Sequence, residues 1–166
     1  SHFALWCFAK APLLLGNDLR KMTQEQLEIV TNTNLISVNQ DPHAKQASCF
    51  LGCDPNKAKW SVFATRLTGG DVAVLVINWM DSTSPSLTFP AHVVGVVPAQ
   101  SKKQKVWVTD LWTNKVIARY DFNSAKTIPV TPLASHGCVA YRLSIVIDNN
   151  KDLTDSTTLQ DLQQKD

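Results

Sequence analysis

Two neighbouring polar residues, Asn17 and Asp18, stand where a carboxylate could take part in chemistry. They follow residues 13–15, a short apolar run closed by Gly16, which is typical of a strand buried on both faces of a parallel sheet. In α/β folds the loop after such a strand faces the functional side. The alternative is a turn in which both side chains bond the local backbone. We favour the turn and keep Asn17 and Asp18 as candidates for ligand contact.

Three further groups have positions that favour structural roles. Asp41 precedes Pro42, where a carboxylate commonly caps backbone N–H groups. Asp110 is expected to end a strand or begin a turn, and His136 with Gly137 is typical of the turn into a last strand. The other histidines lack the Ser, Cys or Asp arrangement of a catalytic triad, and the sequence contains no paired CxxC or Cys/His spacing of a zinc site. No metal ligand set is expected.

The four cysteines are too few and too irregularly spaced for a disulfide scaffold. Cys49 and Cys53 are close enough to bridge within one loop, and Gly52 beside them supplies turn chemistry. Two reduced thiols are the alternative, and we favour the disulfide slightly. Cys7 lies in an apolar helical pattern and Cys138 in an apolar strand pattern, so both are interpreted as small buried hydrophobic residues.

Length and charge narrow the class of protein. The 166 residues can form one ordinary domain, or a compact domain with a short extra segment. The net charge is +2, and the basic residues are scattered except for Lys102, Lys103 and Lys105, which we interpret as a solvated loop. This distribution argues against nucleic acid as a partner. The longest apolar stretch, 3–15, is shorter than the ~20 residues that cross a bilayer, so no membrane span is indicated. No phosphate-binding loop and no cofactor are expected.

The first 41 residues follow the pattern of an α/β fold. Apolar residues from His2 to Ala11 predict a largely buried helix, which Pro12 ends, and the strand at 13–15 follows. Thr23 with a Gln three residues later predicts a capping box and a helix through about residue 31. The chain opens directly into an aromatic-rich segment, so it is expected to begin inside a fold. The order of helix, strand and helix in this part of the chain is therefore typical of an α/β fold.

Beyond residue 41 the pattern changes to β. The best hairpin joins the strands 60–67 and 72–79 through a Gly-Gly turn. The other strands are expected in the following ranges: 87–89, 93–97, 105–109, 116–121, 126–130 and 138–147. Residues 42–147 are thus predicted to form an antiparallel β-sandwich of Greek-key type. Residues 148–166 are strongly polar and are expected to form a frayed tail.

The stretch HFALWCFAKAPLLLGNDLRKMTQEQLEIVTNTNLISVNQDP, at residues 2–42, resembles the end of the catalytic barrel in the α-galactosidase and α-N-acetylgalactosaminidase family of retaining glycoside hydrolases. Farther on, GGDVAVLVINW, VTDLWTNKV and HGCVAYRL are similar to landmarks of that family's C-terminal β domain. The resemblance extends over roughly residues 1–143. It implies a (β/α)8 barrel that removes terminal α-linked galactose or a related sugar, followed by an antiparallel β domain. By this resemblance residues 1–41 are the last α-β-α piece of that barrel.

The resemblance also implies where the chemistry lies. Such enzymes use two carboxylic acids about 5 Å apart, one as nucleophile and one as acid and base. In the family both aspartates belong to barrel strands well before the HFALW stretch, so this chain is expected to contain no catalytic residue and to be inactive alone. The α-galactoside would bind the preceding barrel. The family implies a secreted, lysosomal or vacuolar protein, no cofactor and a possible homo-oligomer. An α-N-acetylgalactosaminidase fragment is an alternative.

The tryptophans leave a second function class open. Aromatic faces stack on sugar rings, so a carbohydrate-binding β module is conceivable for a domain with four tryptophans in or beside its predicted strands. These residues are Trp60, Trp79, Trp107 and Trp112. In apolar-rich strands, however, tryptophans more often fill the core between sheets. We favour the core interpretation for all four.

Overall fold

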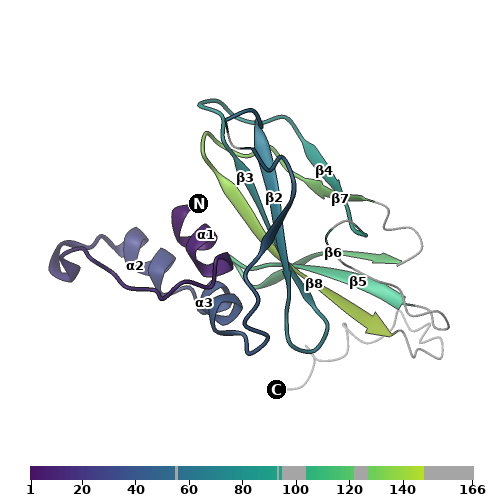
Figure 1. Ribbon diagram of the computed structural model, residues 1–166, viewed down its shortest axis with the longest axis horizontal. Helices are drawn as coiled ribbons and strands as arrows, with labels where there is room; N and C mark the ends of the chain where they lie inside the picture. Colours follow the sequence, from purple (N-terminus) through teal and green to yellow (C-terminus); the bar gives the residue numbers. More distant parts are fainter. Residues whose placement is uncertain (55, 93, 95–103, 122–126, 148–166) are drawn as a thin grey trace, which may run out of the picture.

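The fold is a six-stranded antiparallel sheet covered by helices on one face and by a two-stranded sheet on the other (Figure 1). The computed structural model describes residues 1–54, 56–92, 94, 104–121 and 127–147. The helical segments of this part are α1 (His2–Phe8), the 3-10 turn η1 (Leu19–Lys21), α2 (Gln24–Val30) and α3 (Thr33–Gln40). The strands are β1 (Ser48–Leu51), β2 (Trp60–Arg66), β3 (Val72–Asn78), β4 (Leu87–Pro90), β5 (Gln104–Asp110), β6 (Lys115–Asp121), β7 (Thr127–Val130) and β8 (Cys138–Ile147).

The large sheet has the strand order β1-β2-β3-β8-β5-β6, and the small sheet pairs β4 with β7. All the pairings are antiparallel. The predicted hairpin is confirmed as β2 and β3, with Trp60 opposite Asn78 and Arg66 opposite Val72. Gly69 and Gly70 both have positive φ in the turn, a conformation that glycine adopts without steric cost. The predicted mainly antiparallel β class is confirmed.

Every residue of β3 is buried, because this central strand is covered on both faces of the sheet. Val72, Val74 and Val76 point into the core between the two sheets, together with Phe89 of β4 and Ile128 of β7. The alternate residues of β3 point to the other face, where they contact α1 and belong to the same hydrophobic core as α3. A strand with one solvent-exposed face has alternating apolar and polar residues. The residues of β3 are almost all apolar because both faces of this strand are covered.

The helical layer is formed by α1 and α3. Phe8 in α1 and Leu35 in α3 are fully buried in the core on this face of the sheet. The helix predicted at His2–Ala11 is confirmed as the shorter α1, and Lys10, with φ 56°, leaves helical geometry two residues after its end. Helix α3 was not predicted. Its signal was Asn32, whose side chain accepts the backbone N–H of Leu35 as an N-cap.

The predicted strand at residues 13–15 is wrong for this chain. The segment forms no strand, and Leu14 is 76% exposed. A strand exists only when neighbours satisfy its backbone groups, and no described strand lies beside this segment. Residues 13–29 instead run out from the body through η1 and return through α2 (Figure 1). We call these residues the arm.

Most of the other predicted elements are confirmed. The strands expected at 87–89, 105–109, 116–121, 126–130 and 138–147 correspond to β4, β5, β6, β7 and β8. Strand β1 was not predicted; it pairs with β2 at the edge of the large sheet. Of the strand expected at 93–97 only Val94 is described, and it lies in a turn. The tail 148–166, Lys102 and Lys103 lie outside the described residues.

Candidate functional site

Asn17 and Asp18 lie together in a shallow hollow of about 440 Å³ on the arm. The hollow is also lined by Lys21 of η1 and by Gln26 and Val30 of α2. Local signals build this part of the arm, because Thr23 and Gln26 form the predicted capping box, with reciprocal bonds of 3.0 and 3.2 Å. Asp18 is the single carboxylate among the residues that line this hollow.

The carboxylate of Asp18 is occupied by its own turn. Its Oδ1 accepts the backbone N–H of Arg20 at 3.1 Å and the Nε–H of the same residue at 2.9 Å, while Oδ2 accepts Nη2–H at 3.1 Å. These bonds hold the pKa of Asp18 below its usual range. A carboxyl group that stays ionised cannot donate a proton as a general acid. The geometry corresponds to the turn interpretation that the sequence favoured.

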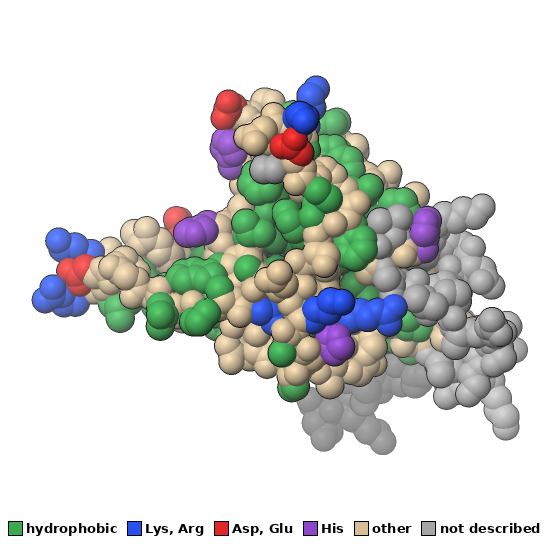
Figure 2. Space-filling model, in the orientation of Figure 1, with side chains coloured by type: hydrophobic (Ala, Val, Ile, Leu, Met, Phe, Trp, Pro, Cys, Tyr) green, Lys and Arg blue, Asp and Glu red, His purple; other side chains and the backbone are tan. Residues whose placement is uncertain are grey.

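The arm exposes an unusual amount of apolar surface. Leu14 is 76% exposed and Leu19 is 65% exposed. Three more large apolar residues of the arm are also exposed, namely Leu15, Leu27 and Ile29. Figure 2 shows apolar side chains gathered along this projecting part of the molecule, on the left of the view. In a protein that is stable in water, a contiguous apolar surface of this kind usually marks an interface.

Asp41 ties the helical layer to the β2–β3 hairpin. Its carboxylate accepts the backbone N–H of His43 at 2.9 Å, the backbone N–H of Thr68 at 3.0 Å and the Thr68 hydroxyl at 3.0 Å. Partial burial raises the pKa of Asp41, but these bonds and the charge of Lys10 outweigh it and hold the pKa below its usual range. The predicted capping role of Asp41 is confirmed.

Asp110 and His136 are both found in turns, as predicted. Asp110 ends β5, and its Oδ1 accepts the backbone N–H of Trp112 at 2.7 Å. His136 has φ 51°, precedes β8, and places its Nε2 2.9 Å from Oδ1 of Asp81. Both members of the His136–Asp81 pair are largely exposed, so the pair contributes little to stability.

The local disulfide between Cys49 and Cys53 is confirmed. It closes the loop from β1 toward β2, where the hydroxyl of Ser61 bonds the carbonyl oxygen of Gly52. Cys7 is buried as predicted, and burial raises the pKa of its thiol to about 12, which makes it a poor nucleophile. Cys138 is only partly buried, and it packs against the core on the helical face.

The core interpretation is confirmed for three of the four tryptophans. Trp60 packs against the core between the sheets, while Trp79 and Trp112 pack against the core beneath the helices. Trp107 differs, because the guanidinium carbon of Arg119 lies 4.6 Å from the centroid of its ring. The guanidinium group thus engages one face of the Trp107 ring in a cation–π contact. We therefore do not propose any of these four tryptophans as a surface on which a sugar ring stacks.

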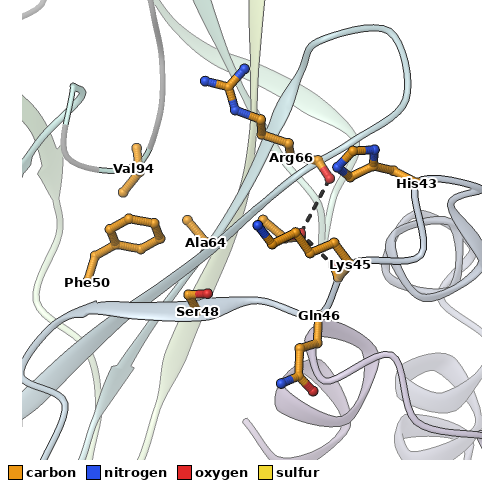
Figure 3. A pocket seen from close by; sticks show the side chains of 9 residues that line it. His43, Lys45, Gln46, Ser48, Phe50, Ala64, Arg66 and Val94 are labelled. Atoms are coloured by element: carbon orange, nitrogen blue, oxygen red, sulfur yellow. Dashed lines mark hydrogen bonds between the residues drawn. The ribbon is translucent and has the colours of Figure 1, made fainter.

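A small basic hollow of about 130 Å³ lies at the β1 edge of the sheet. Figure 3 shows Lys45, His43 and Arg66 on one side of it and Phe50 on the other. The hydroxyl of Thr65 bonds the carbonyl oxygen of Lys45 and so fixes the segment that leads into β1. The sequence did not reveal this grouping, because Arg66 is distant along the chain from His43 and Lys45 and approaches them only when β1 pairs with β2.

A larger cleft, of about 550 Å³, opens between the two sheets. We call it the inter-sheet cleft and define it by Asp110 of β5, Tyr120 of β6, Ile128 and Pro129 of β7, and Tyr141 of β8. Sequence reasoning missed it. The only signal was the presence of Tyr120 and Tyr141 on strands, which does not reveal that the space between them is open.

Two further features concern metal binding and membrane crossing within the described residues. In these parts of the chain no three His, Cys, Asp or Glu residues are grouped so that they could hold a metal ion. Of the described helices, none combines the length and the apolar character that a membrane crossing requires.

Two family models match the chain. The model described as "Alpha galactosidase C-terminal beta sandwich domain" matches residues 57–143, and the model described as "Alpha galactosidase A" matches residues 1–41. Alpha-galactosidase mel1 of Schizosaccharomyces pombe is 33% identical over 86% of this chain and 31% of its own length. Alpha-galactosidase 3 of Arabidopsis thaliana is 32% identical over 86% of this chain and 30% of its own length.

Solved structures give the same result. The crystal structure of alpha-galactosidase I from Mortierella vinacea superposes with a TM-score of 0.72 at 26% identity, covering 86% of this chain and 34% of that one. The chain therefore spans about a third of the length of the relatives that it matches.

Proposed function

This chain belongs to the family of the alpha-galactosidase C-terminal β-sandwich domain, and from that premise we propose that it is the C-terminal part of a retaining α-galactosidase. The proposed whole enzyme removes terminal α-linked galactose from oligosaccharides or glycoconjugates. The observation that carries this proposal is the order of the two family matches on one chain, first at residues 1–41 and then at 57–143.

We propose the following division of the chain. Residues 1–41 are the terminal segment of a (β/α)8 barrel, 42–147 are the β domain and 148–166 are a polar tail. The exposed leucines of the arm support this division, because a parallel barrel strand beside Leu14 and Leu15 would cover both their side chains and the unpaired backbone. The exposed apolar side chains of the arm are thus what we expect of a segment that is buried inside a complete barrel.

We propose that the catalytic carboxylates belong to the preceding barrel and not to this chain. A retaining hydrolase needs one ionised carboxylate to attack the anomeric carbon and one protonated carboxyl group to donate to the leaving oxygen, about 5 Å away. Asp18, Asp41 and Asp110 each bond nearby backbone N–H groups. Bonds of this kind to the local backbone are typical of carboxylates that stabilise turns and caps. Asn17 and Asp18 remain candidates for contact with sugar at the mouth of the barrel.

In this proposal the β domain supports the end of the barrel structurally. Its large sheet buries one face beneath α1 and α3, and Asp41 bonds the β2–β3 hairpin, so the barrel end is held on a rigid support. An oligomer of the whole enzyme and a secreted, lysosomal or vacuolar location are further parts of this proposal. The Cys49–Cys53 disulfide supports such a location, since disulfides persist in oxidising compartments.

Two measurements on the native polypeptide test the proposal. Its intact mass should exceed that of the 166-residue chain by the mass of a barrel. The native polypeptide should hydrolyse 4-nitrophenyl α-galactoside faster than 4-nitrophenyl α-N-acetylgalactosaminide, and NMR should detect α-galactose as the first product. A faster reaction with the N-acetylated substrate would favour the α-N-acetylgalactosaminidase alternative, and a native mass equal to that of this chain would overturn the proposal.

A further inference from the structure

The inter-sheet cleft contains a tyrosine hydroxyl that the protein leaves unpartnered. Tyr141 is only 4% exposed, yet its hydroxyl makes no hydrogen bond to any described residue. Among the described residues no fully buried side-chain N or O atom lacks a partner, so this hydroxyl keeps some accessible surface, and Tyr141 lines the cleft. Burial, aided by Asp110 and Tyr120, raises the pKa of Tyr141 to about 12. The hydroxyl is therefore protonated at neutral pH and can both donate and accept.

Asp110 supplies an acceptor in the same cleft. Its Oδ1 accepts the backbone N–H of Trp112 at 2.7 Å, and among the described residues Oδ2 has no hydrogen-bond donor. Asp110 lines the cleft and is near enough to Tyr141 to add to the rise in the pKa of that hydroxyl, which burial mainly causes. Carboxylate oxygens accept hydrogen bonds. The cleft thus presents an acceptor beside a hydroxyl that can donate.

The lining of the cleft is mostly apolar, and Asp110 is the one charged residue among the described residues that form it; three hydroxyl residues, Ser86, Thr88 and Thr131, also line it. Tyr120 and Ile117 of β6 and Ile128 and Pro129 of β7 form part of its walls. No lysine, arginine or histidine is found among the described residues that line it, so an anionic ligand would find no counter-charge. A volume of about 550 Å³ lies within the ~300–1,000 Å³ of typical small-molecule sites.

We propose that the inter-sheet cleft binds a neutral pyranose sugar. A pyranose has an apolar C–H face, which suits the Tyr120 ring and Pro129, and hydroxyl groups, which suit Asp110 and Tyr141. Adjacent sugar hydroxyls donate to Oδ2 of Asp110, while the Tyr141 hydroxyl donates to another sugar oxygen. This site belongs to the β domain and does not depend on catalysis by a barrel.

The test titrates the 166-residue chain with methyl α-galactopyranoside and methyl α-glucopyranoside, using calorimetry and saturation-transfer NMR. Cyclohexanol, which keeps the ring but has one hydroxyl, is the matched apolar ligand. We expect at least one pyranoside to bind more tightly than cyclohexanol. Tyr141→Phe removes only the unpartnered hydroxyl, so it should weaken sugar binding about tenfold. The same variant should leave the unfolding temperature unchanged, because no bond within the protein is lost.

Arg119→Ala is the control, since Arg119 stacks on Trp107 and does not line the cleft. This control should bind sugar as the original chain does. The proposal is overturned if neither pyranoside binds, if cyclohexanol binds as tightly as the sugars, or if Tyr141→Phe leaves the affinity unchanged. Equal loss of binding in Arg119→Ala and Tyr141→Phe would also overturn it, because the effect would then come from the fold and not from the hydroxyl.

Discussion

Asn78 links the two layers of the β domain, and its replacement by alanine tests the packing most sharply. The side chain is fully buried at the end of β3. Its amide nitrogen lies 2.8 Å from the carbonyl oxygen of Ser82, 2.9 Å from that of Ala134 and 3.2 Å from that of Leu133. Its Oδ1 accepts the backbone N–H of Met80 at 3.1 Å. One side chain thus joins the segments before β4 and β8.

The size of the effect follows from counting these bonds. The amide has two hydrogens for three carbonyl groups, so one hydrogen is shared, and Asn78 makes the equivalent of three bonds. At about 1 kcal/mol for each bond, Asn78→Ala should reduce the free energy of unfolding by about 3 kcal/mol. A typical domain has about 5–15 kcal/mol in total, so the loss should be large but measurable.

The assay is urea unfolding followed by tryptophan fluorescence. With a urea slope of about 2 kcal/mol per M, Asn78→Ala should lower the midpoint by about 1.5 M. Asn56→Ala is the control, because Asn56 is exposed in a turn, and it should change stability by no more than about 0.5 kcal/mol. A loss below about 1 kcal/mol for Asn78→Ala, or equal losses for both variants, would refute this description of the junction.

Three other predictions concern the junction, the arm and the disulfide loop. The pKa of Asp41 is lower in the folded than in the unfolded chain, so its carboxylate stabilises the folded state at neutral pH, and this stabilisation is lost as the pH falls below about 4. Over this pH range the urea midpoint of Asp41→Asn should therefore fall less steeply than that of the original chain. The isolated chain should self-associate in sedimentation velocity, and Leu14→Glu with Leu19→Glu should reduce that association; a monomeric original chain would contradict the prediction. Gly52→Ala places a Cβ at positive φ against the carbonyl oxygen of Trp60, so it should cost about 2 kcal/mol in urea unfolding, and a neutral result would show that this loop can relax.

Local sequence chemistry was sufficient for the elements whose causes are local. The capping box at Thr23 and Gln26, the Gly69–Gly70 hairpin turn and the five-residue Cys49–Cys53 loop depend on neighbours within a few positions, and the structure contains all three. The cap by Asp41 was predictable for the same reason, although its bonds to the distant Thr68 were not.

Features that depend on distant partners were not predictable. Residues 13–15 have the composition of a buried strand, but without neighbouring strands Leu14 is exposed and the segment forms no ladder. The inter-sheet cleft unites Asp110, Tyr120 and Tyr141 from three strands, and the open space between them results from the way the small sheet covers the large one. Strand periodicity indicates which residues face inward, but it does not reveal where the packing leaves room.

The proposal that catalysis lies outside this chain is tested most directly by the rate at which the isolated 166-residue chain hydrolyses 4-nitrophenyl α-galactoside. We expect no hydrolysis above the rate in buffer, because Asp18, Asp41 and Asp110 are engaged in turns and caps. The native polypeptide, assayed beside it, should be active. Hydrolysis by the isolated chain at a rate similar to that of the native polypeptide would contradict the proposed role of this chain.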